Sequence, residues 1–245
     1  MIRLAFALLL ALAVTLPARA GDPAASGFTP AQRAQIVAIL RQALTSDPSI
    51  LRDAVTALQA DEAARHDASA RDQLARLSPA LTAQAGDPVE GNPQGDVTVV
   101  EFYDLRCPYC RRMLPVMAEL LKRDARVRVV LKDIPILGPD SVLGARAVLA
   151  AQRQGGYAKL QSAIMQGGKQ ITPDTLHAAA TASGLDWDTL QHDMADPAIT
   201  ARIEANLDLA HQLGVEGTPA FVIGRQMLPG ALDLAELQGA IAAAR

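Results

Sequence analysis

The sequence is poor in cysteine and in net charge, and both shortages exclude classes of protein. Two cysteines in 245 residues exclude a disulfide-held scaffold, because small secreted scaffolds of that kind are dense in cysteine. A formal net charge of −3, with no basic stripe along the chain, gives no sign of the positive surface that nucleic-acid-binding proteins have. Only 3% of the residues are aromatic, but half are hydrophobic and 20% are charged. This balance is typical of a globular chain and excludes a disordered or collagen-like one.

One apolar run at the N-terminus has the pattern of a secretory signal. Residues 1–3 supply a basic start, residues 4–16 are apolar, and Ala18-Arg19-Ala20 fits the small-x-small rule for cleavage. The run is too short to cross a bilayer comfortably as a helix, although an uncleaved membrane anchor stays an alternative. We expect residues 1–20 to be a signal peptide cleaved after Ala20, which places the rest in an oxidising compartment.

Residues 21–85 are predicted to form helices with little core of their own. Thr29, Pro30 and Gln32 have the pattern of a capping box with proline at the first helical position, and apolar residues then recur at helical spacing. Asp47-Pro48 predicts the start of a second helix. Its apolar stripe thins to Leu74 and Leu77, so the helix is either a solvated connector or half of an oligomeric seam.

Breaks at Ser78-Pro79 and at the Gly-Asp-Pro and Gly-Asn-Pro runs of 86–88 and 91–93 predict the end of this helix. We place a domain boundary at about residue 86 and assign 86–245 to a second domain. Its expected strands are 97–103, 126–131, 221–223 and 226–228, and its expected helices are 107–123, 139–213 with breaks at 155–156 and 167–168, and 234–244. Strands that alternate with helices in this order predict an α/β fold with a helical insertion at about 139–213.

The motif Cys107-Pro108-Tyr109-Cys110 follows a strand and opens a helix, and in that context a C-x-x-C motif indicates redox chemistry. Residues three apart on a helix are neighbours, so the two sulfurs can close a small disulfide ring. Cys107 would lie at the helix N-terminus, where free amides and the helix dipole favour a thiolate. Cys110 would lie one turn deeper, which favours Cys107 as the attacking thiol and Cys110 as the resolving thiol.

Three other uses of the cysteine pair remain as alternatives. A structural zinc site needs two more ligands, and none of the four histidines pairs with another at ligand spacing. A structural disulfide over so short a loop would stabilise little. Soft thiolates suit copper(I), so copper bound at Cys107 and Cys110 is a further alternative. Met113 and Met117 could add soft ligands, although such a pair is more often core filling.

A late run, Gly217-Thr218-Pro219, places a proline at the start of an apolar strand, where proline is tolerated. A cis Thr218–Pro219 bond and an ordinary trans turn are equally open from the sequence. A loop beside Cys107 would leave backbone groups free to pair with an extended substrate chain.

The run 101–110, together with Pro115 and Gly217-Thr218-Pro219, resembles the thioredoxin superfamily. More narrowly it is similar to the DsbA-like thiol:disulfide oxidoreductases with a helical insertion, in the subgroup that contains the Com1-like and ScsC proteins. The similarity extends to 135–141, and the N-terminal helices resemble the N-terminal domain of ScsC, the suppressor-of-copper-sensitivity thioredoxin.

The resemblance implies a thioredoxin fold and a catalytic role for five residues. Cys107 is the implied nucleophile, Cys110 the resolving thiol, Pro219 the cis-proline with Thr218 before it, and Glu101 the buried acid for proton transfer. Glu101 shares a strand face with Val97 and Val99, which favours an inward position for its side chain, although an exposed strand position stays open. No cofactor other than a Cys107–Cys110 disulfide is implied.

Tyr109 departs from the strongest oxidases of the family, which have histidine there and so place a positive charge beside the thiolate. We therefore expect a less oxidising disulfide and a protein that acts as an isomerase or reductase more than as a strong oxidase. A DsbA-type oxidase is the alternative, and a copper(I)-sequestering protein is a further alternative. The expected partners are secreted or envelope proteins and a membrane redox partner, in the periplasm. We also expect a homo-oligomer through residues 29–77, which the resemblance implies is a trimer. Several active sites held around one client would raise the effective concentration of the attacking thiol at that client.

Overall fold

The computed structural model describes residues 27–168 and 170–245, so the expected signal peptide at 1–20 lies outside the described residues. By their contacts the residues form two units that divide between Glu62 and Ala63. Across the described residues, no helix combines the length and the apolar character needed to cross a membrane.

The first unit is helical, as the sequence predicts. Helix α1 (Pro30–Ser46) begins with the expected capping box, in which the Gln32 amide donates to Thr29 Oγ1 and the Thr29 amide donates to Gln32 Oε1. Helix α2 (Ser49–Thr82) begins in this unit and ends in the next. No residue of α1 is buried, and its large apolar side chains, such as Leu40, are exposed.

Helix α2 does not stop at Pro79, so the predicted break there is wrong. The helix continues through Pro79 to Thr82, and the Ala83 amide still donates to the Pro79 carbonyl at 3.0 Å. Proline costs a helix one hydrogen bond and a steric contact. Here Leu74 and Leu81, on either side of Pro79, are both buried against the sheet, and this packing holds the helical path.

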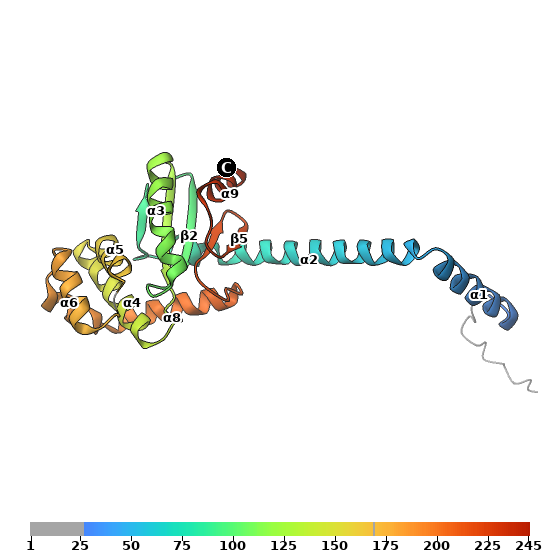
Figure 1. Ribbon diagram of the computed structural model, residues 1–245, viewed down its shortest axis with the longest axis horizontal. Coiled ribbons are helices and arrows are strands. Elements are labelled where there is room, and N and C mark those ends of the chain that lie inside the picture. The colour runs from blue at the N-terminus through green and yellow to red at the C-terminus, as the bar shows by residue number, and fades with distance from the viewer. Residues whose placement is uncertain (1–26, 169) are drawn as a thin grey trace, which may run out of the picture. The chain divides into compact units, whose positions relative to one another are not determined.

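A five-stranded mixed sheet, of which Figure 1 labels β2 and β5, forms the centre of the second unit, and its strand order is β1-β3-β2-β4-β5. The strands are β1 (Val89–Gly91), β2 (Val97–Tyr103), β3 (Val127–Asp133), β4 (Ala220–Ile223) and β5 (Gln226–Pro229). β2 and β3 are parallel, and the other neighbours are antiparallel. The four predicted strands are confirmed. β1 was not predicted, because three residues among glycines and prolines give too little pattern.

Helices cover both faces of this sheet. Besides α2, the helices of this unit are α3 (Pro108–Arg123), α4 (Pro139–Ala151), the 3₁₀ turn η1 (Gln152–Gln154), α5 (Tyr157–Gly167), α6 (Pro173–Ala182), α7 (Trp187–Met194), α8 (Pro197–Gln212) and α9 (Leu234–Ala244). Figure 1 shows α4, α5 and α6 grouped beside the sheet, as the helical insertion between β3 and β4. The expected glycine breaks at 155–156 and 167–168 are confirmed, and the insertion has further breaks before α7 and before α8.

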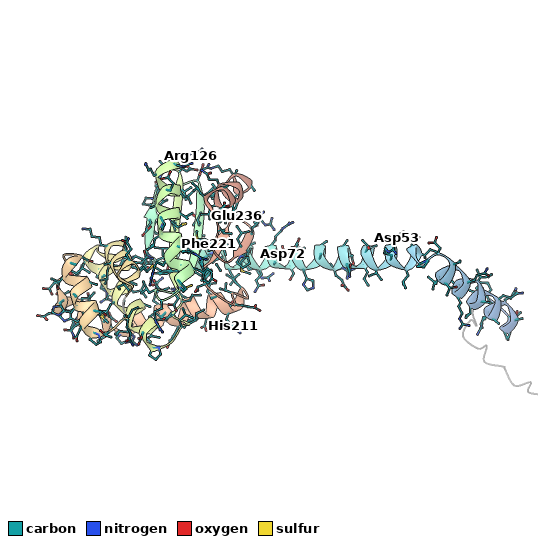
Figure 2. The ribbon with its side chains drawn as sticks, viewed as in Figure 1. Asp53, Asp72, Arg126, His211, Phe221 and Glu236 are labelled. Carbon is teal, nitrogen blue, oxygen red and sulfur yellow. The ribbon has the colours of Figure 1, made fainter. Side chains whose placement is uncertain are left out.

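Two buried clusters fix these helices to the sheet. One joins α3 and α9 to the face of β2 that carries Val97 and Val99. The other joins the end of α2 and α8 to the opposite face, which carries Val100 and Phe102. Phe221, labelled in Figure 2, is fully buried on β4 and lies opposite Glu101 of β2. The architecture confirms an α/β thioredoxin-like fold with a helical insertion and a helical segment before it.

Candidate active site

The two cysteines lie where β2 passes into α3. Cys107 is the N-cap of α3, with extended backbone, and Pro108 occupies the first helical turn. The Cys107 amide donates to the Asp104 carbonyl at 3.0 Å, which closes the turn between strand and helix. Cys110 follows one turn later and is 1% exposed, against 5% for Cys107. Both are free thiols, and the deeper position expected for Cys110 is found.

The loop before β4 lies directly beside Cys107. The Thr218–Pro219 peptide bond is cis, which resolves the choice that the sequence left open. The Cys107 thiol donates to the Thr218 carbonyl, with Sγ and O 3.1 Å apart. Residues 214–220 of this loop line a cavity of about 340 Å³ together with Met227. The structure thus brings together three of the expected site residues, Cys107, Thr218 and Pro219, from positions more than a hundred residues apart in the sequence.

Asp104 holds the cysteine loop in place, although it was not among the site residues predicted from the sequence. Its carboxylate accepts hydrogen bonds from the Arg106 amide at 2.7 Å, the Leu137 amide at 3.0 Å and the Ser141 hydroxyl at 2.8 Å. Asp104 is 2% exposed. An aspartate whose side chain accepts from the amide two residues later forms an Asx turn. An aspartate three residues before Cys107 could therefore have predicted a turn between the strand and the helix.

Glu101 and Cys110 line one cavity behind the cysteine loop. This cavity has a volume of about 520 Å³ and is also lined by Glu90, Tyr103 and residues of α3 and α5. Glu101 is buried, so the inward position expected for it is confirmed. Burial raises the pKa of Glu101 to about 8, and the negative charge of Glu90 adds to the effect. Burial likewise raises the pKa of the Cys110 thiol.

The surface beside the cysteines carries one aromatic ring with a cation over it. Tyr109 is 52% exposed, and the guanidinium carbon of Arg112 lies 4.3 Å from its ring centroid. Met113 and Met117 are buried in the core cluster of the sheet. Among residues 27–168 and 170–245, no group of three His, Cys, Asp or Glu side chains is placed to hold a metal ion.

Two family profiles match the chain. The DSBA-like thioredoxin domain matches residues 98–242, which is more than half of the chain. The N-terminal domain of the copper resistance protein ScsC matches residues 32–65. The chain belongs to the DSBA-like thioredoxin domain family and has an ScsC-type N-terminal domain ahead of that domain.

Solved structures with the same fold support this assignment. A thioredoxin-like oxidoreductase from Silicibacter pomeroyi DSS-3 is 42% identical, with a TM-score of 0.67, and the match covers 68% of this chain and 96% of that one. ScsC from Proteus mirabilis, in a transitional conformation, is 28% identical with a TM-score of 0.65, and the match covers 89% and 97% of the two chains. A periplasmic thioredoxin-like protein from Salmonella enterica serovar Typhimurium is 30% identical with a TM-score of 0.63, over 69% and 95% of the chains.

Curated relatives include much longer proteins. The Na(+)/H(+) antiporter NhaA 3 of Salinispora tropica is 31% identical over 160 residues, which are 64% of this chain and 24% of the antiporter. The chain thus spans about a quarter of the length of the first curated relatives that it matches.

Proposed function

We propose that this protein is a thiol:disulfide oxidoreductase that exchanges disulfides with secreted or envelope proteins in the periplasm. The observation that carries the proposal is the contact of the Cys107 thiol with the Thr218 carbonyl, beside the cis bond to Pro219. Cys107 is the N-cap of α3, and this contact places its sulfur next to a backbone segment that a client chain can pair with. The signal-like segment at 1–20 supports the periplasmic location.

In the proposed reaction the Cys107 thiolate attacks a client disulfide and forms a mixed disulfide, while the other client sulfur leaves as a thiolate. Cys110 then attacks the Cys107 sulfur, which forms the Cys107–Cys110 disulfide and releases the second client sulfur as a thiolate. Glu101, in its ionised form, accepts the proton that Cys110 loses in this step, because both side chains line the same cavity. The reverse sequence oxidises a client dithiol, and a membrane redox partner restores the starting state.

We further propose that the protein works as an isomerase or reductase more than as a strong oxidase. Tyr109 places no charge beside Cys107, where a histidine would stabilise the thiolate form and make the disulfide more oxidising. The exposed apolar side chains of α1 and of the first turns of α2 support assembly through residues 29–77, and we propose a trimer. Isolated apolar residues on a surface are ordinary, but this run includes Ile39, Leu40, Leu51 and Leu58 at 55–65% exposure.

Two variants test the exchange reaction. Cys107→Ala should abolish insulin reduction and the refolding of scrambled ribonuclease. Cys110→Ala should instead accumulate a mixed disulfide that a thiol reagent releases, because the resolving sulfur is missing. Activity that survives Cys107→Ala would overturn the proposal. Stoichiometric copper(I) binding without any exchange activity would favour the copper-sequestering alternative, in which Cys107 and Cys110 are ligands.

Assembly is tested separately by sedimentation of the protein that starts at residue 21. We expect an oligomer for this chain and a monomer for a variant with Leu40→Glu and Leu51→Glu, because buried carboxylates would oppose association. Arg41→Glu, on the same helix, is the matched control and should keep the oligomer. A monomer for the unsubstituted chain would contradict assembly through residues 29–77.

A further inference from the structure

Three buried oxygen-bearing side chains form a closed ring next to the Cys110 cavity. Tyr103 at the end of β2 and Asp133 at the end of β3 are partners in the strand register, and Tyr157 is the first residue of α5. The Tyr103 hydroxyl lies 2.6 Å from Asp133 Oδ1, and the Tyr157 hydroxyl lies 2.7 Å from Asp133 Oδ2. The two hydroxyls lie 2.6 Å from each other. All three side chains are at most 6% exposed.

Counting protons fixes the charge of this ring. Three oxygen–oxygen contacts of hydrogen-bond length need one proton each, since two oxygens this close without a proton between them repel. The two phenols supply two protons. The third must come from the Asp133 carboxyl, so that Asp133 donates to Tyr157, Tyr157 donates to Tyr103, and Tyr103 donates back to Asp133. An ionised Asp133 would accept from both phenols and leave the contact between the two hydroxyls without a proton.

We propose that Asp133 is a neutral carboxylic acid in this ring and that it is a positioning residue, which holds the α5 wall of the Cys110 cavity against β2. The same helix α5 that Tyr157 begins contributes Gln161, Ser162 and Met165 to the lining of that cavity. From β2, Tyr103 and Glu101 line it too. The ring is therefore the direct link between the two walls that enclose Glu101 and Cys110.

The charged surroundings of the ring agree with a neutral Asp133. Burial, helped to a smaller extent by the nearby carboxylate of Asp104, raises the pKa of Asp133 to about 7, although hydrogen bonds with the two phenols lower it. Lys132 is adjacent in sequence, but its ammonium binds Asp87 and is not available to Asp133. From α8, Asn206 contributes only its neutral amide, which donates to the main-chain oxygen of Asp133 at 3.2 Å.

Ionisation of Asp133 is expected to loosen the cavity. With two protons for three contacts, the hydroxyls of Tyr103 and Tyr157 must separate, and α5 moves away from β2. Asp133 differs from Glu101 in this respect, because it exchanges no proton with a cysteine and acts only through the position of α5. The link to catalysis rests on the proposed function, whereas the neutral ring can be tested without it.

Asp133→Asn is the informative variant, because an asparagine can donate to Tyr157 through its amide and accept from Tyr103 through its carbonyl at every pH. In a Glu101→Gln background, which removes the buried acid that lines the cavity, infrared difference spectra at pH 6 should show the carbonyl band of a protonated aspartic acid. That band should disappear in Asp133→Asn and should shift in Tyr157→Phe. Its absence at pH 6 would overturn the neutral ring.

The positioning role is tested by the alkylation of Cys110 with a small maleimide in a Cys107→Ala background. The ratio of the alkylation rates of the Asp133 chain and the Asp133→Asn chain should be near one at pH 5 and should rise several-fold by pH 8, as the aspartate ionises. A ratio that stays constant across this range would overturn the positioning role. Neither readout requires turnover, so a failure of the proposed exchange reaction, seen with intact Cys107 in the insulin assay, remains distinguishable.

Discussion

The ammonium of Lys132 lies 2.6 Å from Asp87 Oδ2, and the two side chains are 0% and 2% exposed. Arg202 of α8 binds the other oxygen of Asp87 at 2.7 Å. Lys132 also donates to the carbonyl of Ala80 at 2.8 Å and to the side chain of Gln84 at 3.2 Å. The last carbonyls of a helix have no hydrogen-bond partner within the helix. Lys132 supplies a donor to one of these carbonyls of α2, and this bond fixes the end of α2 to β3.

The first prediction is that Asp87→Ala strongly destabilises the second unit. The substitution leaves a buried ammonium without its carboxylate, and breaking a buried pair in this way costs about 3–5 kcal/mol. Urea denaturation at pH 7 measures the effect. The matched control is Glu119→Ala, which removes the exposed pair of Glu119 with Arg123 and should cost at most about 1 kcal/mol. Equal costs for the two variants would show that the Lys132–Asp87 pair does not hold α2.

The second prediction concerns where the chain can be shortened. A protein of residues 63–245 keeps Leu74 and Leu81, which are buried against Val100 and Phe102, and should unfold cooperatively with intact exchange activity. A protein of residues 86–245 loses both leucines and uncovers that sheet face. Each fully buried leucine contributes about 1.5–3 kcal/mol, so the shorter protein should lose several kcal/mol and bind a hydrophobic dye. Equal stabilities in urea would contradict a structural role for residues 63–85.

Local patterns in the sequence were enough to predict most of the elements and the centre of the site. The β-branched run at 97–103, the cysteine pair after it and the capping aspartate at 233 are all signals within a few residues. Pro79 was misread because the contacts that keep its helix intact come from distant strands. The Asp133 ring was not identified for the same reason, since its members lie 24 to 54 residues apart and each is unremarkable alone.

The third prediction is that Tyr109→His makes the Cys107–Cys110 disulfide more oxidising. A protonated imidazole beside the helix N-terminus stabilises the thiolate and with it the reduced form, as the neutral phenol cannot. A tenfold shift of the equilibrium with glutathione corresponds to about 30 mV, and we expect a shift of at least this size. Tyr109→Phe is the control, because it keeps the ring under Arg112 and adds no charge. The same shift in both variants would show that charge is not the cause.

The fourth prediction separates the effect of Glu101→Gln on stability from its effect on the rate at which the mixed disulfide is resolved. Burial raises the pKa of Glu101 from 4.5 to about 8, so between these values the folded protein holds a proton that the unfolded chain releases. The stability of the wild type therefore falls as pH rises from about 4.5 through about 8. Glutamine cannot ionise, so the variant should match the wild type near pH 4 and exceed it by a few kcal/mol near pH 9.

In the same variant, resolution of the mixed disulfide should slow by about 10²-fold or more at pH 9, where Glu101 of the wild type is ionised, since a positioned proton acceptor contributes that much to such a step. Stopped-flow measurement of client release gives the rate, and urea denaturation at several pH values gives the stability. Glu90→Gln is the matched control, because it removes the partly exposed carboxylate of the same cavity and should change the rate far less. A variant that gains stability at high pH but resolves the mixed disulfide at the normal rate would leave Glu101 a buried acid with no part in proton transfer.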